Sequence, residues 1–160
     1  MRDAAFAAAR PAPGGQGETA DPRATRFRLA VIVCARRLWL EDLGDEALAT
    51  EQLQLVVAIA RALEHGAGEP AEPAVTQFDW PLHDNRQLDL GAHEAAAALS
   101  SFLGRRLHEQ ACVELMCLGQ AAAERVAPLA LSCPVRHLPA TKALLCAPLR
   151  KRELWRELRA

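Results

Sequence analysis

The sequence predicts an α/β fold, a small three-layer sandwich in which helices flank a four-stranded parallel sheet. Apolar, strand-like segments alternate along the chain with segments of helical periodicity, which is the pattern of a sheet covered by helices. The first strand-like segment, 27–35, is apolar except for Arg28, as is typical of strands buried on both faces. Hydrophobic residues make up 51% of the 160 residues and charged residues 24%, so the chain has enough apolar side chains to form a core.

The first 26 residues differ in composition from the rest of the chain. They contain three Pro, three Gly and many small side chains. Such a segment buries too little apolar surface to offset the conformational entropy lost on ordering. We therefore expect residues 1–26 to be a disordered tail and residues 27–160 to form the α/β domain.

The first half of this domain predicts two strands separated by a loop and a helix. Val and Ile at the centre of the first apolar segment favour a buried strand. Asp45 is suited to the N-cap of the helix, whose apolar residues recur along one face, and Pro81 stops the second strand. The expected elements are a strand at 27–35, a loop at 36–44, a helix at 46–64 and a strand at 74–80.

The second half continues the alternation of strands and helices. Gly119 follows an apolar segment and precedes an Ala-rich one, and Pro139 and Pro148 each suit the first position of a helix. The expected elements are a helix at 92–108, a strand at 112–118, a short helix ending near Val126, a strand at 129–133, and helices at 140–147 and 148–159.

Charge is distributed unevenly along the chain, although its sum is only −1. Residues 27–135 carry eight Arg and fifteen acidic residues, a net −7, whereas residues 136–160 carry seven Lys and Arg and two acidic residues, a net +5. The near-neutral sum excludes a strongly basic nucleic-acid module. The basic end can meet an acidic partner or phosphates, or it can be the solvated face of a helix.

The residues that follow the predicted strands do not assemble a known active site. Ligands of doubly wound sheets lie at the carboxyl ends of the strands, and the sequence has no GxGxxG, GxxxxGK[ST] or Gly-x-Ser-x-Gly motif there. His83 beside Asp84, and His137 beside Arg136, are the polar pairs that most resemble catalytic groups. His83 and Asp84 fit either a general base with its orienting group or a solvated loop that caps the next helix. Cys133 precedes His137 by four positions across a proline, which places the thiol out of reach of the imidazole.

The five cysteines and the N-terminal sequence indicate in which cellular compartment the protein resides and whether it binds a cofactor. The cysteine count is odd, most lie in apolar segments, and no Cys-x-x-Cys spacing occurs, so we expect reduced, buried thiols and no metal or other cofactor. The N-terminus lacks the apolar core of a signal peptide. No apolar run approaches the ~20 residues that span a bilayer. We expect a cytoplasmic protein with no membrane association.

Two groups of large apolar residues are candidates for partner contacts. Trp39 lies in the predicted 36–44 loop with Leu40 and Leu43, and an apolar loop tip suits an interface. Phe6 is the large apolar residue of the tail between its alanines. These four residues are the predicted contacts.

The last predicted helix carries candidate structural anchors. Leu154, Trp155 and Leu158 recur at helical spacing and form a stripe that can pack onto the sheet. Replacing Trp155 by Ala is therefore expected to destabilise the domain by ~3–5 kcal/mol, whereas the Trp39 replacement is expected to leave the fold nearly intact.

The C-terminal segment from His137 to Leu158 resembles the end of the psi subunit of bacterial DNA polymerase III. The shared features are a short helix, an x-Pro pair, a basic turn and the Leu154-Trp155 pair. The apolar strand at 27–35, the Val-x-x-Phe strand at 74–80 and the order of elements across residues 27–158 are similar as well. The resemblance implies the fold that psi shares with uracil-DNA glycosylases.

The resemblance also implies a function, that of a non-catalytic bridging subunit in DNA replication. Psi proteins hold the tau/gamma clamp-loader subunits through a flexible N-terminal peptide. Their α/β body binds the chi subunit, which contacts single-stranded DNA-binding protein. Psi N-termini usually contain a short apolar helix with a Trp, whereas residues 1–26 of this chain contain Phe6 and no Trp. The implied partners are chi and tau/gamma, with an indirect link to single-stranded DNA-binding protein.

Two other functions stay open from the sequence. Small uracil-DNA glycosylases carry a Gly-rich acidic loop after the first strand and a His-Pro motif, whereas this strand runs into Ala35-Arg36-Arg37 and Leu138 separates His137 from its proline. A repair enzyme of that kind is one alternative, and an α/β interaction domain with an unrelated partner is the other. Direct DNA binding is expected to be weak at most, because residues 27–135 carry a net −7 and no aromatic and basic stripe recurs along the strands.

Overall fold

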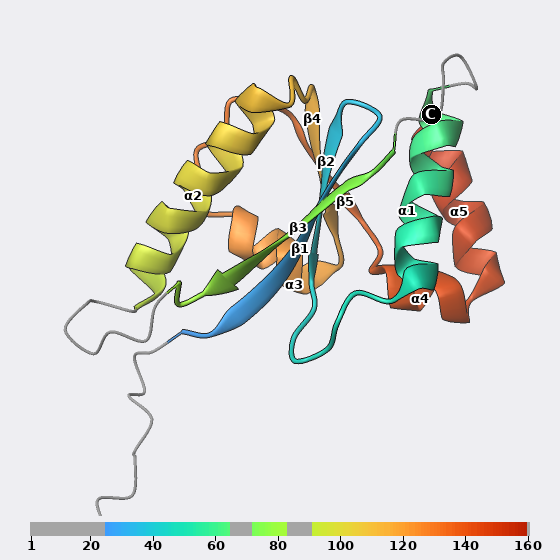
Figure 1. Cartoon of the computed structure of the whole chain (residues 1–160). Coiled ribbons are helices and arrows are strands. Elements are labelled where there is room, and N and C mark those ends of the chain that lie inside the picture. The colour runs from blue at the N-terminus through green and yellow to red at the C-terminus, as the bar shows by residue number, and fades with distance from the viewer. Residues whose placement is uncertain (1–24, 65–71, 83–90, 160) are drawn as a thin grey trace, which may run out of the picture.

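A five-stranded sheet lies between two layers of helices in the computed structural model, which describes residues 25–64, 72–82 and 91–159 (Figure 1). Helices α2 and α3 cover one face of the sheet, and α1, α4 and α5 cover the other. The elements are β1 (Phe27–Cys34), β2 (Arg37–Asp42), α1 (Thr50–Leu63), β3 (Ala74–Trp80), α2 (Ala92–Glu109), β4 (Glu114–Leu118), α3 (Gln120–Val126), β5 (Val135–Leu138), α4 (Thr141–Cys146) and α5 (Pro148–Arg159).

The sheet is mixed, which corrects the expected four-stranded parallel sheet. Its strand order is β3-β1-β2-β4-β5. Strand β1 pairs antiparallel with both of its neighbours, whereas β2, β4 and β5 pair in parallel. The three-layer α/β arrangement is confirmed, and the number and direction of the strands were predicted wrongly.

The additional strand is β2, within the segment that the sequence predicted as a loop. Strands β1 and β2 form a hairpin whose two turn residues, Ala35 and Arg36, both have a φ of 54°. Two successive residues of positive φ are characteristic of a two-residue type I′ turn, which usually contains Asn or Gly. The hairpin was not predicted because its turn, Ala35-Arg36, contains neither Asn nor Gly.

The last strand also lies elsewhere than predicted. Strand β5 begins at Val135, after the predicted 129–133 strand has ended, and pairs with β4 from Leu115 to Leu118. Leu129 and Leu131 instead pack, partly buried, against the core without strand structure. Their apolar character reflects this packing, while the Arg and His of β5 are tolerated because it is an edge strand with one neighbour.

The remaining elements lie close to their predicted positions. Seven predicted elements are confirmed, and none of their predicted ends shifts by more than two residues. They are β1, β3, β4, α2, α3, α4 and α5. Helix α1 begins at Thr50, four residues later than expected, and Asp45 is therefore not its N-cap. The predicted tail, including Phe6, lies outside the described residues except for its last two.

Two hydrophobic clusters form the core, one on each face of the sheet. The first joins the strands to α2 and α3, and the second joins them to α1, α4 and α5. Successive residues of β2 divide between them, because Leu38 and Leu40 belong to the first cluster and Trp39 to the second. No helix within the described ranges is long and apolar enough to cross a bilayer.

Candidate functional site

The three predicted loop contacts lie in the core and not on the surface. Trp39 and Leu40 are 0% exposed and Leu43 is 9% exposed. The indole Nε1 of Trp39 donates a hydrogen bond to the carbonyl oxygen of Cys34 at 3.4 Å. The prediction that these side chains contact a partner is wrong, because the segment is an interior strand buried on both faces rather than a loop.

The three predicted anchors lie at the second core cluster. Leu154 is 2% exposed, and the partly buried Trp155 and Leu158 pack against the same cluster. Together they attach α5 to the layer that also contains α1 and α4. The opposite side of α5 is exposed to solvent.

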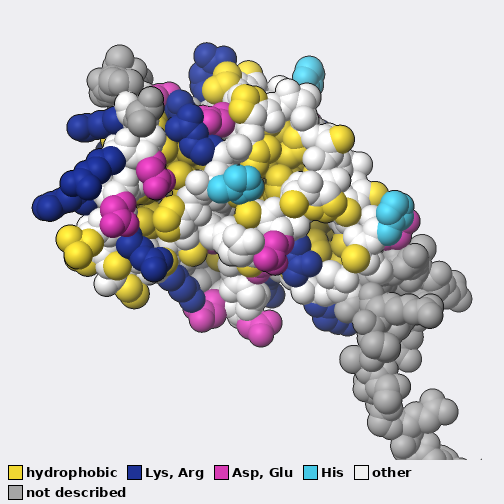
Figure 2. All heavy atoms as spheres, turned by 180° about the vertical axis from the view of Figure 1, so that it is seen from behind, with side chains coloured by type: hydrophobic (Ala, Val, Ile, Leu, Met, Phe, Trp, Pro, Cys, Tyr) yellow, Lys and Arg dark blue, Asp and Glu magenta, His cyan; other side chains and the backbone are white. Residues whose placement is uncertain are grey.

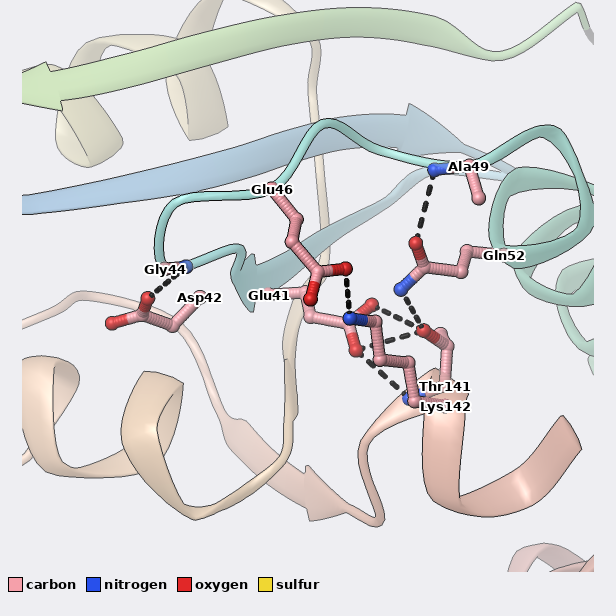
Figure 3. Close-up of polar contacts among 8 residues, drawn as sticks. All are labelled: Glu41, Asp42, Gly44, Glu46, Ala49, Gln52, Thr141 and Lys142. Carbon is pink, nitrogen blue, oxygen red and sulfur yellow. Dashed lines mark hydrogen bonds and ion pairs between the residues drawn. The ribbon is translucent and has the colours of Figure 1, made fainter. Parts of the chain in front are cut away.

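A buried polar network fixes the start of α4 to the sheet and to α1 (Figure 3). The Thr141 backbone N–H donates to Oε1 of Glu41 at 2.9 Å, and the Thr141 hydroxyl lies 2.8 and 2.7 Å from the two Glu41 oxygens. Nε2 of Gln52 donates to the Thr141 hydroxyl at 2.7 Å, and Oε1 of Gln52 accepts from the Ala49 N–H at 3.0 Å. The three side chains are at most 4% exposed.

Glu41 acts as a helix cap supplied from another element. The N-cap residue of α4 is Ala140, which has no side-chain acceptor for the free N–H groups of the first turn. The Glu41 carboxylate, at the end of β2, takes that role. Burial raises the pKa of Glu41, while its hydrogen bonds from Thr141 and the positive charge of Lys142 act in the opposite direction. Lys142 itself is paired with Glu46.

A shallow hollow of about 670 Å³ lies where β4 and β5 end, at the edge of the sheet where α/β proteins bind ligands. Gly119 has a φ of +85°, and a Cβ at this position would lie 2.9 Å from the Cβ of Ala140. The turn into α3 therefore packs directly against the start of α4. The lining residues are Gly119, Gln120, Ala123, Glu124, Ala127, His137, Leu138, Pro139, Ala140, Ala143 and Arg150.

Of the polar pairs singled out in the sequence, the described residues contain His137 and Arg136, which do not form a catalytic group. His137 lines the hollow, but its neighbour Arg136 pairs with Glu114 through Nε at 2.9 Å. Glu114 also pairs with Arg37 at 3.1 Å, so it links β2, β4 and β5 across the sheet. His83 and Asp84 lie outside the described residues.

Four of the five cysteines are structural in character, and the fifth, Cys146, is exposed. Burial raises the pKa of Cys117 to about 11, and it also raises the pKa of Cys34, Cys112 and Cys133. These thiols are therefore protonated at neutral pH and are poor nucleophiles. Within residues 25–64, 72–82 and 91–159, no group of three or more His, Cys, Asp or Glu side chains is placed to hold a metal ion.

The outer side of α4 and α5 combines exposed apolar and basic side chains. Leu145 is 37% exposed and Leu149 is 71% exposed, the largest value for a large hydrophobic residue in the described ranges. Figure 2 shows Lys and Arg side chains gathered at the end of the molecule that carries α5, with hydrophobic and acidic side chains between them. This surface is the strongest candidate for a partner contact. The sequence predicted that the basic end can meet an acidic partner or phosphates, but of these two helices it named only the buried stripe residue by residue.

The Glu41 network was also missed from the sequence. Glu41 and Thr141 are 100 residues apart, and no local spacing connects them. One signal was present, because the predicted helix at 140–147 follows Leu138-Pro139 and has no Ser, Thr, Asp or Asn at its N-cap. Such a helix start requires an acceptor from elsewhere in the fold.

Comparisons with known proteins identify no relative of this chain. No protein-family model, no curated protein and no solved structure matches it significantly.

Proposed function

We propose that this chain is a non-catalytic subunit of a DNA polymerase III assembly that, like psi, bridges the tau/gamma clamp loader and a chi subunit. Through chi it is linked to single-stranded DNA-binding protein. The proposal rests on the resemblance of residues 137–158 to the end of psi.

The observation that carries the proposal is the division of this C-terminal segment into an attached and a free side. Thr141, Leu144 and Leu154 are buried and hold the segment to the body. Leu145 and Leu149 remain exposed beside basic residues. An exposed apolar surface on a firmly attached unit is what a bridging subunit needs, because the contact keeps its geometry when a partner binds.

The test is reconstitution with purified proteins of the native host. We expect the full chain to elute from gel filtration together with chi and to be retained by immobilised tau/gamma. A Leu145→Ser variant is expected to lose at least one of these associations, whereas Val113→Ser, which changes a side chain 48% exposed outside this surface, is expected to keep both. Recovery of neither partner at low salt would contradict the proposal.

A uracil-DNA glycosylase-like enzyme is the second candidate, and His137 at the strand-end hollow is the observation in its favour. Cleavage of uracil-containing single- and double-stranded DNA separates the two candidates. We expect no release of uracil above background. Release that a His137→Ala variant abolishes would favour the enzyme.

A further inference from the structure

The outer face of α5 presents a continuous basic stripe. Leu149, Arg152, Arg156 and Arg159 are spaced by three, four and three residues, which places them along one side of an α-helix. All four side chains are exposed, and they lie opposite the side on which Leu154 is buried. We refer to these four residues as the α5 outer face.

The α5 outer face is electrostatically unfavourable for the isolated chain. Arg152 and Arg156 are four residues apart and Arg156 and Arg159 are three apart, and like charges at both spacings repel on a helix. The first turn of α5 contains no acidic residue and carries Arg150 and Lys151, although the positive end of the helix dipole lies there.

Four arginines of the body are compensated, unlike those of the α5 outer face. Arg28, Arg37 and Arg136 form ion pairs with Asp79 or Glu114, and Arg125 pairs with Asp42 while lying 4.3 Å from the ring centre of Phe27. Within the described ranges, Arg152, Arg156 and Arg159 form no ion pair, either with Glu153 and Glu157 of the same helix or with other elements.

We infer that the α5 outer face binds an acidic, amphipathic segment of a partner protein, whose carboxylates pair with Arg152, Arg156 and Arg159 and whose apolar side chain covers Leu149. Carboxylates at this position relieve both the arginine repulsion and the cationic start of the helix. Leu149, 71% exposed, adds the apolar contact that gives an interface its centre.

The same chemistry disfavours nucleic acid as the occupant. A phosphate backbone makes no use of the exposed Leu145 and Leu149, which are 37% and 71% exposed. The inference does not depend on which assembly the partner belongs to, so it stands apart from the proposed function.

The test is a titration of the full chain against a fluorescein-labelled helical peptide of Asp and Glu with Leu at every third or fourth position. We expect saturable binding by fluorescence anisotropy that weakens with salt. Arg152→Gln combined with Arg156→Gln should weaken binding about ten-fold, since each exposed ion pair contributes a factor of a few. Leu149→Ser should weaken it without changing the salt dependence.

A charge-matched control locates the effect. Arg61→Gln combined with Arg105→Gln removes two exposed arginines from α1 and α2, and it should bind the peptide like the unchanged chain. The inference is overturned if the peptide does not bind, if the control loses as much affinity as the α5 variant, or if a single-stranded oligonucleotide of the same charge binds more tightly than the peptide.

Discussion

At the scale of single residues, the Glu41–Thr141 contact shows how a buried charge is made acceptable. A carboxylate 4% exposed loses most of its hydration, and three hydrogen-bond contacts from Thr141 replace part of it. No buried side-chain nitrogen or oxygen in the described ranges lacks a hydrogen-bond partner. The network therefore depends on each of its members, and removing one leaves the others unsatisfied.

Replacing Thr141 by Val is expected to destabilise the protein by about 1–3 kcal/mol. The change keeps the side-chain shape but removes the hydroxyl between Glu41 and Gln52, so two buried polar groups lose a partner. The measurement is the free energy of unfolding in urea. Thr76→Val is the matched control, because that hydroxyl makes a single 3.4 Å contact on the edge strand β3 and should matter less. Equal losses for the two variants would contradict the proposed importance of the network.

The raised pKa of Glu41 is expected to make the stability of the protein depend on pH. Because burial raises the pKa of this group above its ordinary 4.5, the folded protein binds a proton more readily than the unfolded chain between 4.5 and the raised value. The free energy of unfolding of the native chain should therefore rise, relative to Glu41→Gln, as the pH falls through that window. Urea titrations of both proteins at several pH values measure the difference. A difference that is flat, or that changes in the other direction, would show that the pKa is not raised.

At the scale of elements, the sequence predicts most of the helices and strands, and its failures have physical reasons. Strands β1, β3 and β4 are apolar where they cross the core, and their positions follow from composition. Strand β2 does not follow, because its turn contains neither Asn nor Gly and its ends carry Arg37 and Asp42. The position of strand β5 was not predicted, because β5 is a strand through its pairing with β4 and not through its own composition. The predicted site failed together with β2, since burial of Trp39 depends on that strand having a neighbour on each side.

Replacing Trp39 by Ala is now expected to destabilise the domain by ~3–5 kcal/mol, more than replacing Trp155 does. Trp39 is 0% exposed on an interior strand, whereas Trp155 is only partly buried at the edge of the second cluster. Urea unfolding of the two variants checks the order. If Trp155→Ala is the more damaging change, α5 contributes more to the core than its burial indicates.

Two glycines are expected to respond to alanine with opposite signs. Gly119→Ala should destabilise by at least about 1 kcal/mol, because the residue has a φ of +85° and a new Cβ would lie 2.9 Å from Ala140. Gly104→Ala should stabilise by up to about 1 kcal/mol, because that glycine is inside α2 and has nothing within 4 Å of the new Cβ. The melting temperatures of the two variants, compared with that of the native chain, test both signs. A Gly119→Ala protein as stable as the native chain would mean that the two turns at the hollow can separate.

At the scale of the whole molecule, one sheet is shared by two helical layers with different contents. Apolar packing and the Arg125–Asp42 ion pair hold the layer of α2 and α3 to the sheet, and the layer of α1, α4 and α5 combines apolar packing with the buried Glu41 network (Figure 1). The second layer also contains α4 and α5, which belong to the basic segment 136–160 with its net +5. The layer that carries the candidate partner surface is thus the one whose apolar attachment is supplemented by buried polar contacts.

Hydrogen exchange is expected to reveal this difference between the layers. In the Thr141→Val variant, amides of α4 and α5 should exchange faster than in the native chain by more than the global loss of stability accounts for, because their attachment at Glu41 is weakened. Amides of α2 should change only by the global amount, since Leu99 and Leu103 pack into the cluster on the other face of the sheet. Mass spectrometry of peptic fragments resolves the two layers, with Thr76→Val as the reference. Equal acceleration in both layers would mean that they unfold as one unit, and that the C-terminal helices are attached mainly by apolar contacts such as Leu144 and Leu154.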